Sequence, residues 1–118
     1  MPRKALCRKV CRLPKARVFI PSGKASFKEI ILSVEEYEAV RLIDREGFSQ
    51  EECGRFMGVA RTTAQQIYAN ARKKIADALV EGKTLHIKGG DYRLCDGQEE
   101  FCGCGGCKKH KICKGENK

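Results

Sequence analysis

The sequence predicts a mainly α fold: a three-helix unit with a helix-turn-helix, a small two-stranded ribbon and a Cys-rich, irregular C-terminal tail. Capping boxes at Ser33–Glu36 and Ser49–Glu52 mark helix starts, because each serine hydroxyl can accept from a first-turn amide while the glutamate accepts from the serine amide. One short stretch alternates apolar and polar residues, which is typical of a strand. Five of the eight cysteines follow residue 94, in a glycine-rich segment with too few apolar residues for a core.

The 118 residues suffice for one small domain with short appendages. We expect a basic N-terminal arm (1–15), a helix-turn-helix DNA-binding domain (16–90) and a Cys-rich metal-binding tail (91–118), with Gly89-Gly90 as the second boundary. The net charge is +9, and the arm holds six Lys or Arg and no acid. The arm lacks periodicity, so we expect it to be mobile and either to contact phosphates or simply to be solvated.

Two strands are expected in the ribbon. The first is the β-prone stretch Arg17–Ile20, which the turn Pro21–Gly23 ends. The second is Thr84–Lys88, whose apolar residues alternate with period two and which is the expected partner of the first. The stretch Lys24–Leu32 stays ambiguous between a strand end and the entry to the first helix.

The first two helices are predicted from their capping signals. The first begins after Ser33 and is expected to end at Gly47. The second spans about Gln50–Met57 and is ended by Gly58, because glycine tolerates the left-handed conformation that follows a helix. Cys53 falls on the side of this short helix that we expect to be buried, where a free thiol behaves as a small hydrophobe.

The third helix is predicted over Arg61–Glu81, with Gly82 as its C-terminal cap. At ~1.5 Å per residue it is ~30 Å long, which exceeds what reading a DNA groove requires. Its second half, with Ile75, Leu79 and Val80, therefore either covers the ribbon or forms a dimer surface. One stripe of the helix is apolar at three- and four-residue steps: Ala64, Ile67, Tyr68, Ala71, Ile75, Ala78 and Leu79.

The opposite stripe of the third helix carries donors, acceptors and cations, as a helix in the DNA major groove needs. We expect Arg61 to pair with guanine and Gln65 and Gln66 with adenine, and Thr62 to lie on the same face. The alternative is an ordinary helical hairpin with a solvated polar face. The residues expected to hold phosphates are Ser49, Gln50, Thr63, Arg72 and Lys73.

The cysteine tail is expected to bind a soft metal ion, because metal binding energy can replace a hydrophobic core. Zinc is the first choice and an iron–sulfur cluster the second, while a redox-sensitive tail without metal is the remaining alternative. Cys7 and Cys11 are further candidates from the N-terminal arm. The expected ligands come from Cys95, Cys102, Cys104, Cys107 and Cys113.

Residues 32–90 resemble Domain of Unknown Function family 134 through the motifs EAVRLIDREG, QEE...MGV and ARKKIADALVEGK followed by IKGG. The resemblance implies a predicted DNA-binding protein whose helix-turn-helix is similar to region four of bacterial sigma factors. By this likeness Arg61, Thr62 and Gln65 fall where the family's reading helix meets bases. Two positions depart from the family: Ala60 replaces a usual serine, and Gly54 stands where alanines are usual.

We therefore expect a sequence-specific DNA-binding protein, a transcriptional regulator that acts on double-stranded DNA and has no catalytic activity. The sequence offers no placed nucleophile and base, no phosphate loop and no paired His and acid on one face. The alternative is a metal-binding or redox-active protein-interaction module that does not act on DNA. A cytoplasmic location is expected, because no apolar stretch has the length of a signal peptide or membrane span.

Overall fold

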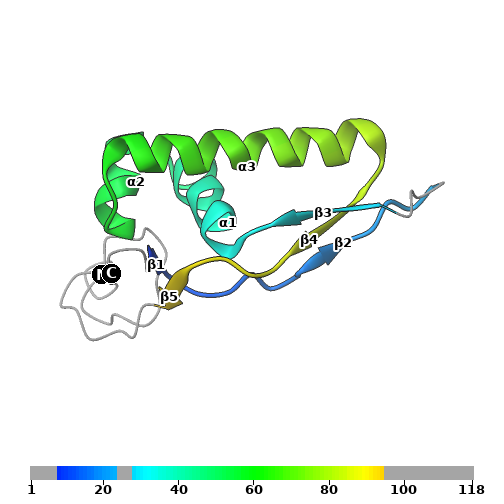
Figure 1. The fold of residues 1–118 in the computed structure, drawn as a ribbon, viewed down its shortest axis with the longest axis horizontal. Coiled ribbons are helices and arrows are strands. Elements are labelled where there is room, and N and C mark those ends of the chain that lie inside the picture. Colours follow the sequence, from blue (N-terminus) through cyan, green and yellow to red (C-terminus); the bar gives the residue numbers. More distant parts are fainter. Residues whose placement is uncertain (1–7, 24–27, 95–118) are drawn as a thin grey trace, which may run out of the picture.

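A computed structural model describes residues 8–23 and 28–94. α3 lies along one side of the molecule, α1 and α2 pack under its N-terminal half, and a small sheet lies under its C-terminal half (Figure 1). η2 is a π-helical turn that continues α1, so the helices form three units, as predicted. In chain order the elements are β1 (Arg8–Val10), β2 (Val18–Phe19), β3 (Glu29–Leu32), α1 (Val34–Val40), η2 (Arg41–Arg45), α2 (Gln50–Met57), α3 (Arg61–Glu81), β4 (Thr84–Ile87) and β5 (Tyr92–Leu94).

Both predicted capping boxes are confirmed. At the start of α1 the Glu36 amide donates to Ser33 Oγ (3.2 Å), and the Ser33 amide donates to Glu36 Oε1 (2.9 Å). At the start of α2 the corresponding distances between Ser49 and Glu52 are 3.0 and 2.8 Å. Because each box satisfies two amides that lack helical partners, the local sequence fixes where these helices begin.

The predicted helix ends are also confirmed, since Gly58 (φ 77°) and Gly82 (φ 64°) are the left-handed C-terminal caps of α2 and α3. The first helix ends next to Gly47 (φ 81°), as expected. Its last turn was not predicted to be π-helical: the Glu46 amide donates to the Arg41 carbonyl at 3.0 Å, a five-residue step. Such single π turns insert one extra residue into a helix.

The ribbon has three strands instead of the predicted two. β2 pairs antiparallel with β4, as expected, with Val18 opposite His86 and Phe19 opposite Leu85. β3 adds to the other edge of β4 in parallel, giving the order β2-β4-β3. This pairing resolves the ambiguity of Lys24–Leu32: parallel strands need a long crossover, and the three helices between β3 and β4 provide it.

A second sheet joins the N-terminal segment to the end of the described chain. β1 pairs in parallel with β5, and Val10 and Cys11 are 0% and 1% exposed. The Cys11 amide donates to Glu38 Oε2 at 3.0 Å, and this buried carboxylate also accepts from the Arg41 guanidinium at 2.9 Å. Residues 8–11 of the expected mobile arm thus pack against the rest of the described chain, and this packing crosses the boundaries predicted after residues 15 and 90.

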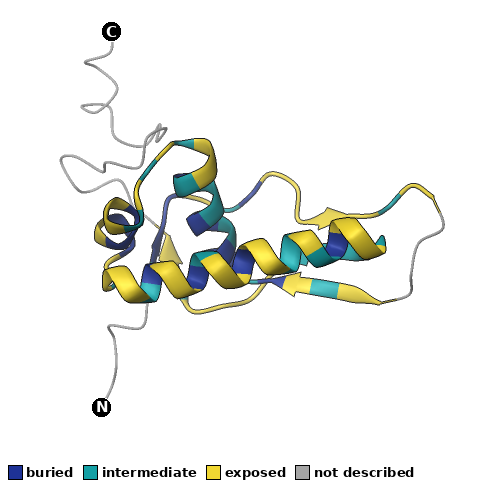
Figure 2. Ribbon diagram, turned by 90° about the horizontal axis from the view of Figure 1, so that it is seen from above, coloured by how far each residue is buried: buried dark blue, intermediate teal, exposed yellow. Residues whose placement is uncertain are grey.

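The core consists of two clusters that α3 bridges, with its buried residues along one side (Figure 2). The first lies between α1, α2 and the start of α3 and includes Leu42, Cys53 and Met57. The second lies between β1, the three-stranded sheet and the middle of α3 and includes Val10 and Ile87. Within residues 8–23 and 28–94, no helix has the length and hydropathy of a membrane span.

Candidate nucleic-acid interface

A tight turn presents the N-terminal end of α3. The Val59 amide donates to the Gly54 carbonyl at 2.9 Å, so the chain folds back closely after α2. A Cβ atom at Gly54 would lie 2.9 Å from the Val59 carbonyl oxygen, which is too close without movement of the turn. Glycine at this position therefore permits the close approach of α2 to the turn, although it lowers intrinsic helix propensity.

The N-terminal half of α3 has one buried and one exposed face. Ala64, Ile67 and Ala71 are buried in the core. Thr63 is half-buried between the two faces. The other side chains predicted to contact DNA from this helix are all exposed: Arg61, Thr62, Gln65, Gln66, Arg72 and Lys73.

Three of these exposed side chains form polar contacts. Gln66 Nε2 donates to Asn70 Oδ1 at 3.1 Å. Lys73 Nζ lies 3.3 Å from Asp77 Oδ2. Arg72 forms an ion pair with Asp44, discussed below. Among the described residues, the side chains of Arg61, Thr62 and Gln65 form no hydrogen bond or ion pair, so a ligand would not have to displace one.

Asp44, in the π turn, holds two side chains of α3. Tyr68 donates its hydroxyl to Asp44 Oδ1 at 2.7 Å, and Arg72 Nε lies 3.6 Å from Asp44 Oδ2. The guanidinium of Arg72 also lies over the Tyr68 ring, 5.5 Å from its centroid. The hydrogen bond to Asp44, together with burial, raises the pKa of Tyr68, because both favour the neutral phenol.

Sequence reasoning did not identify Asp44 or Asn70 as part of this surface. The contact of Asn70 could have been predicted from the sequence, because Asn70 stands four residues after Gln66 and therefore on the same side of the helix. The contact of Asp44 could not, since Asp44 lies 24 residues before Tyr68 and reaches it only through the packing of α1 on α3. The sequence pattern had placed Tyr68 in the apolar stripe, and its ring does pack against the first core cluster.

Ser49 and Gln50 lie apart from the other predicted contacts, at the end of α2 that is remote from the turn. With ~1.5 Å of rise per residue, this helix separates them from the turn by ~12 Å. The Ser49 amide is already bonded to Glu52, and the exposed carboxylates of Glu51 and Glu52 disfavour a nearby phosphate. The structure therefore brings the α3 residues together, while the α2 pair forms a separate group.

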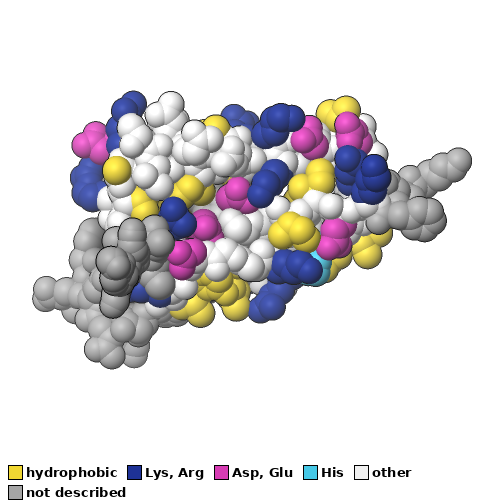
Figure 3. Space-filling model, viewed as in Figure 1, with side chains coloured by type: hydrophobic (Ala, Val, Ile, Leu, Met, Phe, Trp, Pro, Cys, Tyr) yellow, Lys and Arg dark blue, Asp and Glu magenta, His cyan; other side chains and the backbone are white. Residues whose placement is uncertain are grey.

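A polar hollow of about 410 Å³ lies between α3 and the start of α1. Thr62 and Gln66 line it on the side of α3. Its carboxylates are paired: Glu35 Oε2 lies 3.2 Å from Arg8 Nη1, and Glu36 Oε1 lies 2.8 Å from Lys74 Nζ. Acidic and basic side chains are likewise interspersed over the face of the molecule in Figure 3. The pairing reduces the repulsion that these glutamates would exert on an anion next to α3.

The predicted metal ligands mostly fall outside the described residues, namely Cys7, Cys95, Cys102, Cys104, Cys107 and Cys113. Cys11 is described and lies buried in the first core cluster. Over residues 8–23 and 28–94, no group of three or more His, Cys, Asp or Glu residues is arranged to hold a metal ion. Metal binding by the tail therefore stays a prediction.

Cys53 is buried, as predicted, with its Sγ 3.7 Å from Met57 Sδ. Burial, with a smaller contribution from Glu38, raises the pKa of its thiol to about 11. At neutral pH this cysteine is therefore a protonated core residue instead of a nucleophile.

Comparison with known proteins identifies the family. The family model described as "Protein of unknown function DUF134" matches residues 1–95. A UPF0251 protein of Desulfitobacterium hafniense is 51% identical over 113 residues, covering 94% of this chain and 90% of the relative. A UPF0251 protein of Pelotomaculum thermopropionicum is 44% identical over 116 residues, covering 97% and 88%. No solved structure is significantly similar to this chain. The chain belongs to the DUF134 family, as its motifs predicted.

Proposed function

We propose that this protein binds double-stranded DNA sequence-specifically and regulates transcription, with the N-terminal half of α3 in the major groove. The carrying observation is the face formed by Arg61, Thr62 and Gln65. These side chains are exposed and have no described polar partner, on a helix whose other face is anchored in the core. The capped α2 and the tight turn fix the orientation of this helix relative to the rest of the domain.

The side chains divide into two roles in this proposal. Arg61 pairs with guanine through two parallel donors, and Gln65 pairs with adenine as donor and acceptor. Arg72 and Lys73 hold phosphates, and their partners Asp44 and Asp77 orient them before binding. The proposed role is binding, not catalysis.

The test is selection of bound sequences from random DNA, followed by titration of Arg61→Ala and Gln65→Ala. Each substitution should weaken binding by ~1–3 kcal/mol and relax selection at one base position. Arg17→Ala is the matched control, since it removes an exposed cation near β2, away from α3's N-terminal end. If both α3 variants bound the selected DNA as tightly and as selectively as wild type, this assignment would be wrong.

Salt dependence separates DNA binding from the alternative of a protein-interaction module. Neutralising several phosphates releases counterions, so DNA affinity should fall steeply between low and moderate salt. Arg72→Ala or Lys73→Ala should each reduce the slope of log affinity against log salt by about 1. A protein that retains no DNA at low salt would favour the alternative.

A further inference from the structure

Exposed apolar side chains gather where the C-terminal end of α3 passes β2. Ile20, Leu79 and Val80 are 69%, 78% and 83% exposed, and Val18 and Phe19 are also exposed. α3 packs on β3 and β4, while β2 is the edge strand and its Val18 and Phe19 are 44% and 53% exposed. Large apolar side chains that stay exposed together on an edge strand and a neighbouring helix are typical of an interaction surface.

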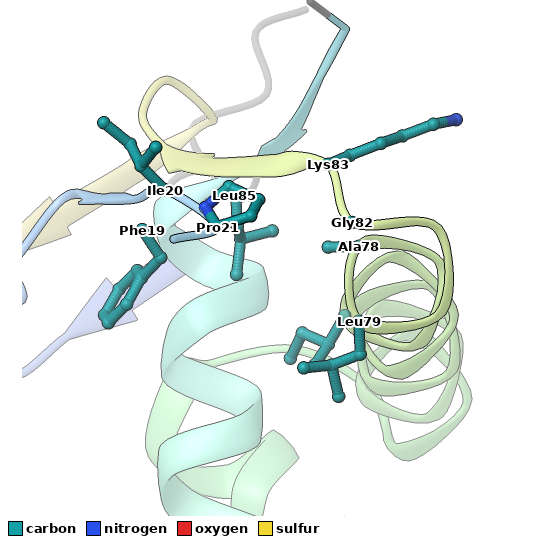
Figure 4. Close-up of a pocket in the computed structure, with 9 residues that line it drawn as sticks. Phe19, Ile20, Pro21, Ala78, Leu79, Gly82, Lys83 and Leu85 are labelled. Atoms are coloured by element: carbon teal, nitrogen blue, oxygen red, sulfur yellow. The ribbon is translucent and has the colours of Figure 1, made fainter. Parts of the chain in front are cut away.

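Three of these side chains, Phe19, Ile20 and Leu79, line an apolar groove of about 300 Å³ (Figure 4). Phe19, Ile20 and Pro21 form one wall, and Ile75 and Leu79 of α3 form the other. In the close-up, Leu79 projects from α3 on the side of the β2 residues. The same surface thus has both a projecting leucine and a groove of matching chemistry.

We propose that this groove is the interface of a symmetric homodimer, in which Leu79 of each copy enters the groove of the other. A two-fold interface pairs one patch with itself, so the patch must contain both the projection and its receptor. The groove and Leu79 meet this requirement.

Charges around the groove agree with a second copy as the partner. The ion pair Glu81–Lys83 (2.6 Å) lies where α3 ends, with Lys83 in the lining of the groove, and the ion pair Lys73–Asp77 (3.3 Å) lies earlier on α3, outside that lining. Two chains of net charge +9 can therefore meet here without a concentration of like charge.

The proposed dimer leaves the base-reading segment Arg61–Gln66 open. Leu79 lies 13 residues beyond Gln66, the end of that segment, or ~20 Å along α3. The inference does not depend on DNA binding, because the groove would associate in its absence.

The experiment is sedimentation equilibrium of the full chain without DNA, from about 1 µM to about 1 mM. Wild type should show a monomer–dimer equilibrium. Leu79→Gln should raise the dimer dissociation constant roughly 100-fold or more, because the substitution removes two buried leucines from each dimer. Ile20→Gln should weaken dimerisation in the same direction.

Leu94→Gln is the matched control, because Leu94 is an exposed leucine on β5, outside the groove, and this variant should dimerise as wild type does. Circular dichroism would verify that each variant is folded. The proposal is overturned if wild type is monomeric over the whole range, or if folded Leu79→Gln and Ile20→Gln proteins dimerise like wild type. Neither result would bear on DNA binding.

Discussion

The buried thiol of Cys53 should make stability depend on pH in the alkaline range. Its pKa is about 11 in the folded protein against 9.0 as the ordinary value, so the folded state keeps a proton that the unfolded chain releases. The free energy of unfolding should therefore fall as pH rises from about 9 to about 11, and this contribution is fully present below that interval.

Urea unfolding of wild type and Cys53→Ala across this pH interval tests the effect. The variant loses packing at every pH, but its stability should fall less between pH 9 and 11. Tyrosines, lysines and the other cysteines titrate in both proteins and cancel in the comparison. Parallel curves would show that Cys53 does not cause the alkaline loss.

Gly90 has a packing role that its local sequence does not reveal. The Gly89-Gly90 pair predicted a domain boundary, but Gly90 (φ 107°) packs where a Cβ would collide with the Glu35 side chain. Glu35 in turn accepts from the Asp91 amide at 3.0 Å and pairs with Arg8. The sequence shows a glycine at this position, but not the distant side chain, Glu35, that leaves no room for a Cβ.

Among the helices, α3 lacks a side-chain cap. Ala60 has the same extended backbone (ψ 155°) as the capping serines of α1 and α2, but it has no hydroxyl to accept from the first turn. Ala60→Ser should therefore raise the free energy of unfolding by about 1 kcal/mol.

Equilibrium unfolding in urea measures this gain, and Ser49→Ala is the reciprocal control. That variant should lose about as much as Ala60→Ser gains, because it removes an existing cap. An unchanged midpoint for Ala60→Ser, together with a lowered one for Ser49→Ala, would show that the turn before α3 prevents capping.

The helices and strands that could be predicted from the sequence are those whose start and end depend on residues close by in the chain. The start of α2 follows from its capping box, and the ends of α2 and α3 follow from Gly58 and Gly82, all within a few residues of the bounds. The exposed face of α3 followed from helical periodicity in the same way. β1 and β5 are three residues each, and their pairing joins segments more than 80 residues apart, so no short window contains the signal. The π turn and the role of Asp44 likewise depend on how α1 packs.

For the whole molecule, a decisive question is whether residues 8–14 belong to the folded domain. Val10 is fully buried in the second core cluster, so Val10→Ala should lower the free energy of unfolding by about 2 kcal/mol. The matched control is Val18→Ala, since Val18 also lies in a short strand but is 44% exposed. A mobile N-terminal arm would instead give no loss for Val10→Ala in urea unfolding.

The strand pairings have a consequence for how the protein is made. β2 and β3 both pair with β4, and β1 pairs with β5, so neither sheet exists before residues 84–94 have been synthesised. A nascent chain that ends in α3 has its helices but leaves three strands without partners, and the apolar side chains of β2 and β3 stay accessible. Folding on the ribosome is thus delayed until β4 emerges, and this interval is when the growing chain is most exposed to aggregation.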